Sequence, residues 1–264
     1  QESSKINYTS SGSETRTITT PFNHIPAVQV LSNWKYHVML TNAGGGYSRW
    51  KDFAVTRWRE DGTCDNWGTF CYIRDLETND YWSNTHQPTR KKAEKYEAAF
   101  SQGRVDFHST QNGIETRTEI VVSPEDDIEM RRLLIKNHSG SKRTIEVTSY
   151  AEVVMAPAAS DLMQPAFSNL FVQTEILPQQ HAILCTRRPR SAEEQSPWMF
   201  HLMTLQGKTP LEVSYETDRM EFIGRGNTTA NPQVMNKPGL LTGHQGSVHD
   251  PVVALRSKIE LDRH

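Results

Sequence analysis

This chain of 264 residues has few cysteines, no long apolar run and no large excess of charge of either sign. Its three cysteines form no Cys-x-x-Cys pair and have no histidine at zinc-ligand spacing. We therefore expect buried, reduced thiols of a cytosolic protein, with no disulfide framework and no metal site. The longest apolar run, Val153–Ala159, is far shorter than the roughly 20 residues of a membrane helix, which argues against direct membrane insertion. Lysine and arginine number 29 against 31 aspartate and glutamate, which argues against nucleic-acid binding through a basic face.

The N-terminal residues are polar, and eight of those from Thr9 to Thr20 are threonine or serine. This stretch lacks the apolar segment of a secretory signal peptide, so we expect a cytoplasmic protein whose residues 1–27 form a flexible lead-in. The mean hydropathy of −0.65 is on the polar side, but six tryptophans, eight tyrosines and nine phenylalanines are too many for a disordered chain. We therefore expect one large folded domain over residues 28–264.

Short alternating segments separated by turn residues predict strands along most of the chain. Asn112-Gly113 lies between two alternating runs, Val105–Thr110 and Ile114–Val122, and predicts a β-hairpin. Alternation from Thr144 to Val154 predicts an antiparallel strand with one buried face. Further strands are predicted at Ile128–Lys136, Phe167–Ile176, Ala182–Arg187, Met199–Leu205 and Val252–Leu261, and loops at Arg188–Pro197 and Asn227–Gln245. Residues 90–99 are compatible with a helix or a strand, and we favour the strand. This series of strands without a long helix predicts an all-β fold, a large antiparallel sandwich.

Residues 41–82 are rich in aromatic side chains and contain the glycine triplet Gly44-Gly45-Gly46. The triplet has neither the Walker nor the dinucleotide-binding spacing, so we interpret it as a sharp turn or a close approach to another surface. The next six residues, Tyr47–Asp52, mix rings with charges and lack the alternation of a strand. An aromatic ring can stack on the C–H face of a sugar while arginine and aspartate bond its hydroxyls, so this segment predicts a sugar-binding loop. Other rings of this region are interpreted as core, among them Phe53, Phe70 and Tyr72.

No motif in the sequence predicts catalysis by this chain. Its ten histidines are scattered without a metal-binding spacing, and no Gly-x-Ser-x-Gly nucleophile motif occurs. Glycoside hydrolysis needs two carboxylates that face each other across a cleft, and the sequence does not show whether any pair does so. The candidate carboxylates are Glu60, Asp61, Asp75, Asp80, Asp126, Asp127 and Asp161. We therefore predict no catalytic residue, no metal and no cofactor.

Several segments resemble those of a known family. They are Leu40–Asp52, Ala54–Asp61, Trp67-Gly68, Tyr72–Asp75, Glu115–Glu119, Pro165–Glu175 and Phe222–Gly226. In this order they are similar to the N-terminal β-sandwich domain of the inverting glycoside phosphorylases that include cellobiose phosphorylase. The sequence looks closer still to the phosphorylase-like portion of cyclic β-1,2-glucan synthase. The similarity spans roughly Val28 to Leu261, and its first segment is the most specific.

The resemblance implies a β-supersandwich of the galactose-mutarotase-like, carbohydrate-binding type. In that family an (α/α)6 barrel follows the sandwich and carries the catalytic acid and the phosphate site, while sandwich loops complete the acceptor side of the active site. The resemblance thus implies a β-glucan oligosaccharide, the barrel and a second copy of the chain as partners, and the cytoplasmic part of an inner-membrane glucan synthase as one setting. The implied substrate-binding residues are Tyr47, Ser48, Arg49, Trp50, Lys51, Asp52, Arg57, Trp58, Phe167 and Ser168. Phe167 stands where cellobiose phosphorylases carry polar residues, which suits a different glucan linkage.

Three functions remain open from the sequence. The first is a β-glucan-binding and assembly domain of a glycoside phosphorylase or cyclic β-1,2-glucan synthase, which is not catalytic by itself. The second is a mutarotase-like sugar epimerase or lyase, which needs a histidine–glutamate pair that no recognisable spacing supplies. The third is a purely structural dimerisation domain.

Overall fold

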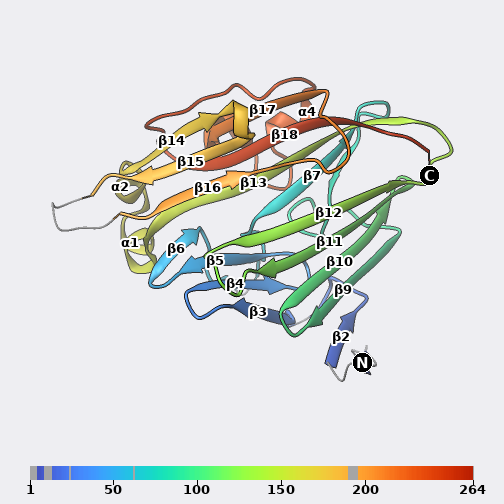
Figure 1. Cartoon of the computed structure of the whole chain (residues 1–264), viewed down its shortest axis with the longest axis horizontal. Coiled ribbons are helices and arrows are strands. Elements are labelled where there is room, and N and C mark those ends of the chain that lie inside the picture. Colours follow the sequence, from blue (N-terminus) through green and yellow to red (C-terminus); the bar gives the residue numbers. More distant parts are fainter. Residues whose placement is uncertain (1–4, 9–13, 24, 62, 190–195, 264) are drawn as a thin grey trace.

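The computed structural model describes residues 5–8, 14–23, 25–61, 63–189 and 196–263. A six-stranded sheet forms one layer (Figure 1), with the strand order β1–β2–β9–β10–β11–β12 and antiparallel pairing throughout. Its strands are β1 (Lys5–Tyr8), β2 (Glu14–Ile18), β9 (Lys95–Ser101), β10 (Arg104–Gln111), β11 (Ile114–Val122) and β12 (Glu129–Asn137). The predicted hairpin turn joins β10 to β11, and Asn112 and Gly113 both have the positive φ that its tight turn requires.

A nine-stranded sheet forms the second layer, with the order β17–β18–β13–β6–β5–β4–β3, with β7 attached to β13 and β8 attached to β7. Its strands are β3 (Val28–Ser32), β4 (Tyr36–Thr41), β5 (Gly46–Trp50), β6 (Phe53–Thr56), β7 (Phe70–Asp75), β8 (Tyr81–Ser83), β13 (Arg143–Pro157), β17 (Glu212–Asp218) and β18 (Pro251–Leu261). The longest strand, β13, pairs with β18, β7 and β6 along its length. It therefore connects the two halves of this sheet.

The prediction of one buried face for β13 was wrong, because every residue from Ala151 to Ala156 is buried. Side chains of Ala151 and Val153 pack against residues of a third, three-stranded sheet, whereas Tyr150 packs with Phe222 in a separate cluster. The third sheet contains β14 (Val172–Leu177), β15 (Ala182–Arg187) and β16 (Trp198–Leu202). A strand between two packed layers loses the polar face that alternation predicts.

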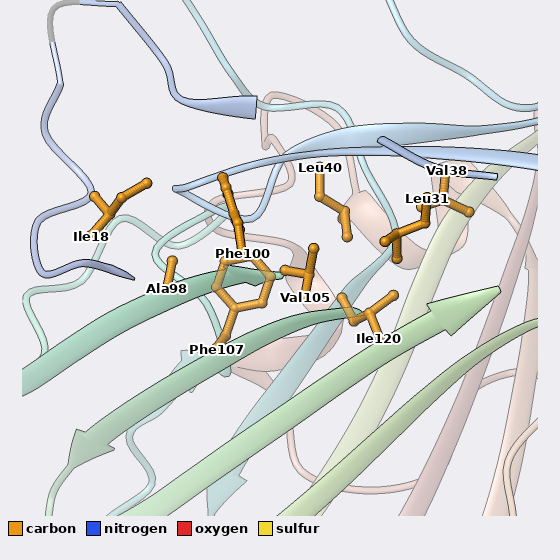
Figure 2. Packing of buried hydrophobic residues seen from close by; sticks show 9 residues of the cluster. All are labelled: Ile18, Leu31, Val38, Leu40, Ala98, Phe100, Val105, Phe107 and Ile120. Carbon is orange, nitrogen blue, oxygen red and sulfur yellow. The ribbon is translucent and has the colours of Figure 1, made fainter. Parts of the chain in front are cut away.

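The core between the first two sheets is apolar (Figure 2). Side chains of β3 and β4 point toward those of β9, β10 and β11, which lie on the opposite side of the view. The cluster contains Ile18, Leu31, Val38, Leu40, Ala98, Phe100, Val105, Phe107 and Ile120. Burial of such side chains is the main favourable contribution to folding of a sandwich of this kind.

Helices are few and short in the described part of the chain. They are α1 (Ala158–Met163), α2 (Pro165–Asn169), α3 (Arg219–Ile223) and α4 (Gln233–Asn236), with a 3-10 turn, η1, at Pro178–Gln180. The strand predicted from Phe167 begins only at Val172, because α2 occupies the preceding residues and starts with Pro165 in its first turn. No helix among the described residues has the length and apolar character needed to cross a bilayer.

The N-terminal segment differs from the flexible lead-in predicted for residues 1–27. Strands β1 and β2 form a hairpin, and β2 pairs with β9. Ile18 of β2 is buried in the core. Residues 1–4 and 9–13 of the predicted lead-in, and residues 190–195 of the predicted loop after β15, lie outside the described residues.

Candidate functional site

The segment predicted as a sugar-binding loop is mostly a strand. Tyr47 to Trp50 belong to β5, which pairs with β4 on one side and β6 on the other, and only Lys51 and Asp52 form the turn to β6. Because successive side chains of a strand point to opposite faces, Ser48 and Trp50 lie on one face and Tyr47 and Arg49 on the other. The structure therefore divides the predicted segment between two faces of the sheet.

Ser48 and Trp50 face the six-stranded sheet. The Ser48 hydroxyl donates to Glu129 Oε2 of β12 at 2.5 Å, and the Trp50 indole N–H donates to Asp127 Oδ2 at 2.6 Å. The Lys51 ammonium lies 4.3 Å from the centre of the Trp50 ring. Trp50 thus joins the two sheets at their shared end, and a sugar that stacks on the face covered by Lys51 has to displace that side chain.

Tyr47 and Arg49 face outward and meet Trp58, which follows β6. The rings of Tyr47 and Trp58 contact edge to face with centres 5.5 Å apart, and the Arg49 guanidinium lies 4.3 Å from the centre of the Tyr47 ring. All three side chains are partly exposed. Two rings and a guanidinium in contact offer a stacking surface together with hydrogen-bond donors.

The glycine triplet allows a close approach, as the sequence predicted. Gly44 and Gly46 have φ of 95° and 152°. A Cβ on Gly45 would lie 1.9 Å from Asp65 Oδ1, and a Cβ on Gly46 would lie 1.9 Å from the Met39 carbonyl oxygen. Asp65 accepts a hydrogen bond from Thr41, and burial raises the pKa of its carboxyl. The triplet lets the loop after β6 pass directly over the start of β5.

Arg57 is the centre of a buried ion network. Its Nη1 lies 2.9 Å from Glu152 Oε2 and 2.8 Å from Asp250 Oδ1, and its Nε lies 3.3 Å from Asp161 Oδ1 of α1. Its Nη2 donates to Asn169 Oδ1 of α2 at 2.8 Å. These contacts bring together the end of β6, β13, the helices α1 and α2, and the segment before β18.

Two further arginines extend the network toward solvent. Arg59 Nη2 lies 2.9 Å from Asp161 Oδ2, and Arg219 Nε lies 2.8 Å from Glu152 Oε1. Burial by itself lowers the pKa of Arg57, but the carboxylates of Glu152, Asp250 and Asp161 outweigh it and raise that pKa above its ordinary value. Each buried charge of the network therefore has a partner of opposite sign.

Residues of the network line a hollow of about 380 Å³ that has both charged and apolar groups in its lining. Its walls come from the loop after β6, from α2 and from the segment before β18. The lining residues are Arg57, Arg59, Trp67, Glu152, Pro165, Ala166, Asn169, Arg219, His249 and Asp250. Trp67 contributes an indole ring and His249 an imidazole, so the hollow combines rings with hydrogen-bonding groups, a combination that suits a sugar.

The predicted residues Phe167 and Ser168 lie in α2 beside this hollow. Ser168 is buried and its carbonyl oxygen accepts from Arg187 Nη1 at 3.0 Å. The Phe167 side chain is 51% exposed and contacts Phe171 edge to face at 5.2 Å. The structure therefore brings Arg57 close to the second predicted segment through Asn169. Trp50 of β5 pairs instead with Phe53 at the start of β6, about 13 Å along that strand from Arg57.

A family model describes almost the whole chain. The model for the supersandwich domain of glycosyl hydrolase family 94 matches residues 13–264. The chain belongs to this family.

The names of the curated relatives of this family 94 domain describe enzymes that act on carbohydrates. This chain is 37% identical to cyclic beta-(1,2)-glucan synthase NdvB of Rhizobium meliloti (strain 1021) over 94% of its length. It is 30% identical to an N,N'-diacetylchitobiose phosphorylase of Vibrio proteolyticus over 93% of the chain, and 24% identical to a solabiose phosphorylase of Paenibacillus borealis over 62%. The matched parts are 9%, 31% and 20% of these relatives' lengths, so the chain corresponds to a minor part of each.

The family 94 domain also contains a histidine–glutamate cluster that the sequence did not reveal. On the outer face of the six-stranded sheet, Glu115 Oε1 lies 3.2 Å from His108 Nε2, and Glu115 Oε2 lies 2.8 Å from His138 Nε2. These contacts lower the pKa of the Glu115 carboxyl. His108 and Glu115 line a second hollow of about 300 Å³. The predicted Asn112-Gly113 hairpin was the sequence feature from which this contact could have been predicted, because it places residues 108 and 115 diagonally across the strand pair.

Two other predictions about reactive groups can be compared with the structure. No group of three or more His, Cys, Asp or Glu residues in the described ranges is arranged to hold a metal ion. The cysteines are unpaired, but the prediction that all are buried was wrong, since Cys64 is exposed and Cys71 is only partly buried. Cys185 is buried, and burial raises the pKa of its thiol to about 12.

Proposed function

We propose that this chain is the carbohydrate-contacting part of a larger family 94 protein and is not catalytic by itself. Its ligand is a β-glucan oligosaccharide, which it contacts on the acceptor side of an active site carried by a catalytic barrel. The names of the relatives support the ligand class, since they include a cyclic glucan synthase and disaccharide phosphorylases. The small share of those relatives that the chain spans supports a role as one part of a larger assembly.

The observation that carries the proposal is the hollow above Arg57. Residues 57 and 165–169 are more than 100 positions apart in the sequence, and they converge on one hollow with Trp67 in its wall. A sugar presents hydroxyl groups and C–H faces together, which suits arginine, asparagine and carboxylate groups beside an indole ring. The carboxylates Glu152 and Asp161 each form an ion pair with an arginine. This pairing supports a role in binding and positioning a sugar rather than in transferring a proton to it.

Exposed apolar side chains beside the hollow support a covering partner. Leu162 and Met163 of α1 are 62% and 81% exposed, and Phe167 and Leu170 follow in and after α2. Apolar side chains grouped in this way commonly mark an interface. We propose that the catalytic barrel of the full-length protein covers them and closes the hollow, with a second copy of the chain as a further partner.

Calorimetric titration of the chain with linear β-1,2-gluco-oligosaccharides and with cello-oligosaccharides tests the proposal. We expect saturable binding of one series, because the hollow provides half of a site, with affinity in the millimolar range since the remaining contacts come from the barrel. Trp67→Ala removes the ring from the hollow and is expected to weaken that binding about tenfold. Trp50→Ala tests the predicted acceptor-side role of Trp50 in the same way.

Trp198→Ala is the matched control, because Trp198 is exposed on β16 in the third sheet and is not among the residues that line the hollow. Equal affinities of the wild type and of all three variants would contradict a role of the hollow and of Trp50. Absence of binding of either series to the wild type would contradict carbohydrate contact by this chain and favour a structural, dimerising domain.

A second candidate function has one specific observation in its favour. The contact of Glu115 with His108 and His138 beside a hollow supplies the histidine–glutamate pair that a mutarotase-like enzyme needs. In such a reaction a base takes the proton of the anomeric hydroxyl while an acid protonates the ring oxygen. Polarimetry of freshly dissolved α-glucose tests it, and a rate equal to that in buffer rejects it.

A further inference from the structure

Trp34 is the most exposed large apolar side chain of the described residues, and it stands at the turn between β3 and β4. Its side chain is 94% exposed. Its backbone φ is 75°, in the left-handed region that L-residues other than glycine, asparagine and aspartate rarely adopt. A bulky residue in this conformation is an outlier that calls for a functional reason.

The turn around Trp34 is well defined. The Asn33 N–H donates to the Tyr36 carbonyl oxygen at 3.2 Å, so Trp34 is the first central residue of a four-residue turn. This is the position where a hairpin turn with positive φ normally carries glycine. Ser32 Oγ accepts from the Trp34 N–H at 3.0 Å, and Asn33 Oδ1 accepts from the Tyr36 N–H at 2.7 Å. The turn therefore holds a tryptophan in solvent where glycine would be less strained.

Three turns are bonded together at this end of the molecule. Asn33 Nδ2 donates to the carbonyl oxygens of Ser123 and Asp126, at 2.8 and 2.9 Å, in the connection from β11 to β12. The Lys51 N–H donates to the Lys35 carbonyl oxygen at 2.7 Å, which joins the turn after Trp50 to the turn that carries Trp34. Trp34 thus occupies a fixed position next to the predicted sugar-contacting residue Trp50.

The exposed side chains of the three turns are mostly polar, and Val30 of β3, four residues before Trp34, is an exposed apolar side chain outside them. The exposed polar residues of the three turns include Ser32, Lys35, Lys51, Asp52, Asp126 and Asp127. The exposed apolar residues of the same turns, apart from Trp34, are Pro124 and Ile128. Protein interfaces place a hot-spot tryptophan within a packed apolar core, whereas a sugar needs a ring for its C–H face and polar groups for its hydroxyls. This environment favours a carbohydrate ligand.

We propose that Trp34 is an aromatic platform for a β-glucan chain and extends the carbohydrate contact beyond Trp50. The inference rests on the proposed function and adds a second contact for longer oligosaccharides. Tyr36 pairs with Trp50, and Trp34 lies two residues before Tyr36, in the turn that the Lys51–Lys35 hydrogen bond joins to the turn after Trp50. In this arrangement, one glucan chain contacts both rings through different sugar units.

A series of oligosaccharides of increasing length tests this arrangement by calorimetry. For the wild type we expect affinity to rise with chain length. Trp34→Ala is expected to lose about tenfold for the longest oligosaccharides and nothing for the disaccharide, because only long chains reach the second ring. Trp34→Gly is expected to show the same loss with an equal or higher thermal midpoint, since glycine relieves the positive φ. Trp198→Ala is the control and is expected to match the wild type.

The possible outcomes separate this inference from the proposed function. A length-dependent gain that persists in Trp34→Ala overturns the inference and leaves carbohydrate binding in place. A wild type that binds no oligosaccharide overturns both. Sedimentation of the variants tests the remaining role of an exposed tryptophan. A wild-type dimer that Trp34→Ala converts to a monomer would make Trp34 a protein contact and overturn the inference.

Discussion

Arg57 connects more parts of this molecule than its local sequence indicates. Its guanidinium contacts two buried carboxylates, Glu152 and Asp161, whose side chains are each 5% exposed. A buried carboxylate without a partner is strongly destabilising, because its desolvation is no longer offset. Arg57 therefore has a structural role whether or not a sugar enters the hollow above it.

Substitution of Arg57 tests this role. Arg57→Leu is expected to lower the free energy of unfolding by about 1–3 kcal/mol, because Glu152 and Asp161 each lose one of two arginine partners and keep Arg219 and Arg59. Arg117→Leu is a suitable control, since Arg117 is 56% exposed and its pair with Asp106 is worth at most about 1 kcal/mol. Urea denaturation of both variants measures the difference. Equal losses would mean that the network around Arg57 contributes little.

At the scale of elements, the β4–β5 and β5–β6 connections determine where the aromatic side chains point. Gly46 begins β5 with its N–H bonded to the Trp67 carbonyl oxygen, and the chain there lies against Met39 of β4. Alternation then directs Ser48 and Trp50 to one sheet face and Tyr47 to the other. A change at Gly46 would therefore disturb both faces and the loop that covers them.

Gly46→Ala is expected to destabilise the fold by more than about 3 kcal/mol, because its Cβ would lie 1.9 Å from the Met39 carbonyl oxygen, a backbone atom. Gly103→Ala is the matched control in the β9–β10 turn. Gly103 also has positive φ, 78°, but a Cβ there meets nothing within 4 Å, so only the backbone cost of about 1 kcal/mol applies. Thermal denaturation compares the two variants. Similar midpoints would mean that the chain at Gly46 moves away without cost.

At the scale of the whole molecule, side-chain contacts connect layers that do not share backbone hydrogen bonds. Glu129 of the six-stranded sheet accepts from Tyr36 and Ser48 of the nine-stranded sheet. His201 of β16 in the third sheet bonds Ser149 of β13 through Nε2 at 2.8 Å. The third sheet therefore depends on β13 both for apolar packing and for this polar contact.

The stability of the whole molecule should depend on pH through His201. Burial lowers the pKa of this imidazole from 6.5 to about 4 in the folded state. Between these two values the unfolded chain binds more protons, so the free energy of unfolding falls as pH decreases from 6.5 to 4, by up to about 3 kcal/mol. Urea denaturation over this range measures the fall.

His201→Gln isolates this contribution from that of the carboxylates. Glutamine can still bond Ser149 but does not titrate, so the variant should lose less stability than the wild type between pH 6.5 and 4. Parallel curves for the two proteins would contradict the role of His201.

Local patterns predicted the all-β class, the Asn112-Gly113 hairpin and the strand Val252–Leu261, because alternation and turn residues act within a few positions. Local sequence segments also showed the resemblance to the family. Local patterns failed for Tyr47–Trp50, where pairing with two neighbouring strands overrides a sequence without alternation, and for β13, where layers on both sides bury both faces. The partners of Arg57 lie 95 to 193 positions away, so only the tertiary structure could bring those charges together. Desolvation and ion pairing act between groups that are close in space, whatever their separation along the chain.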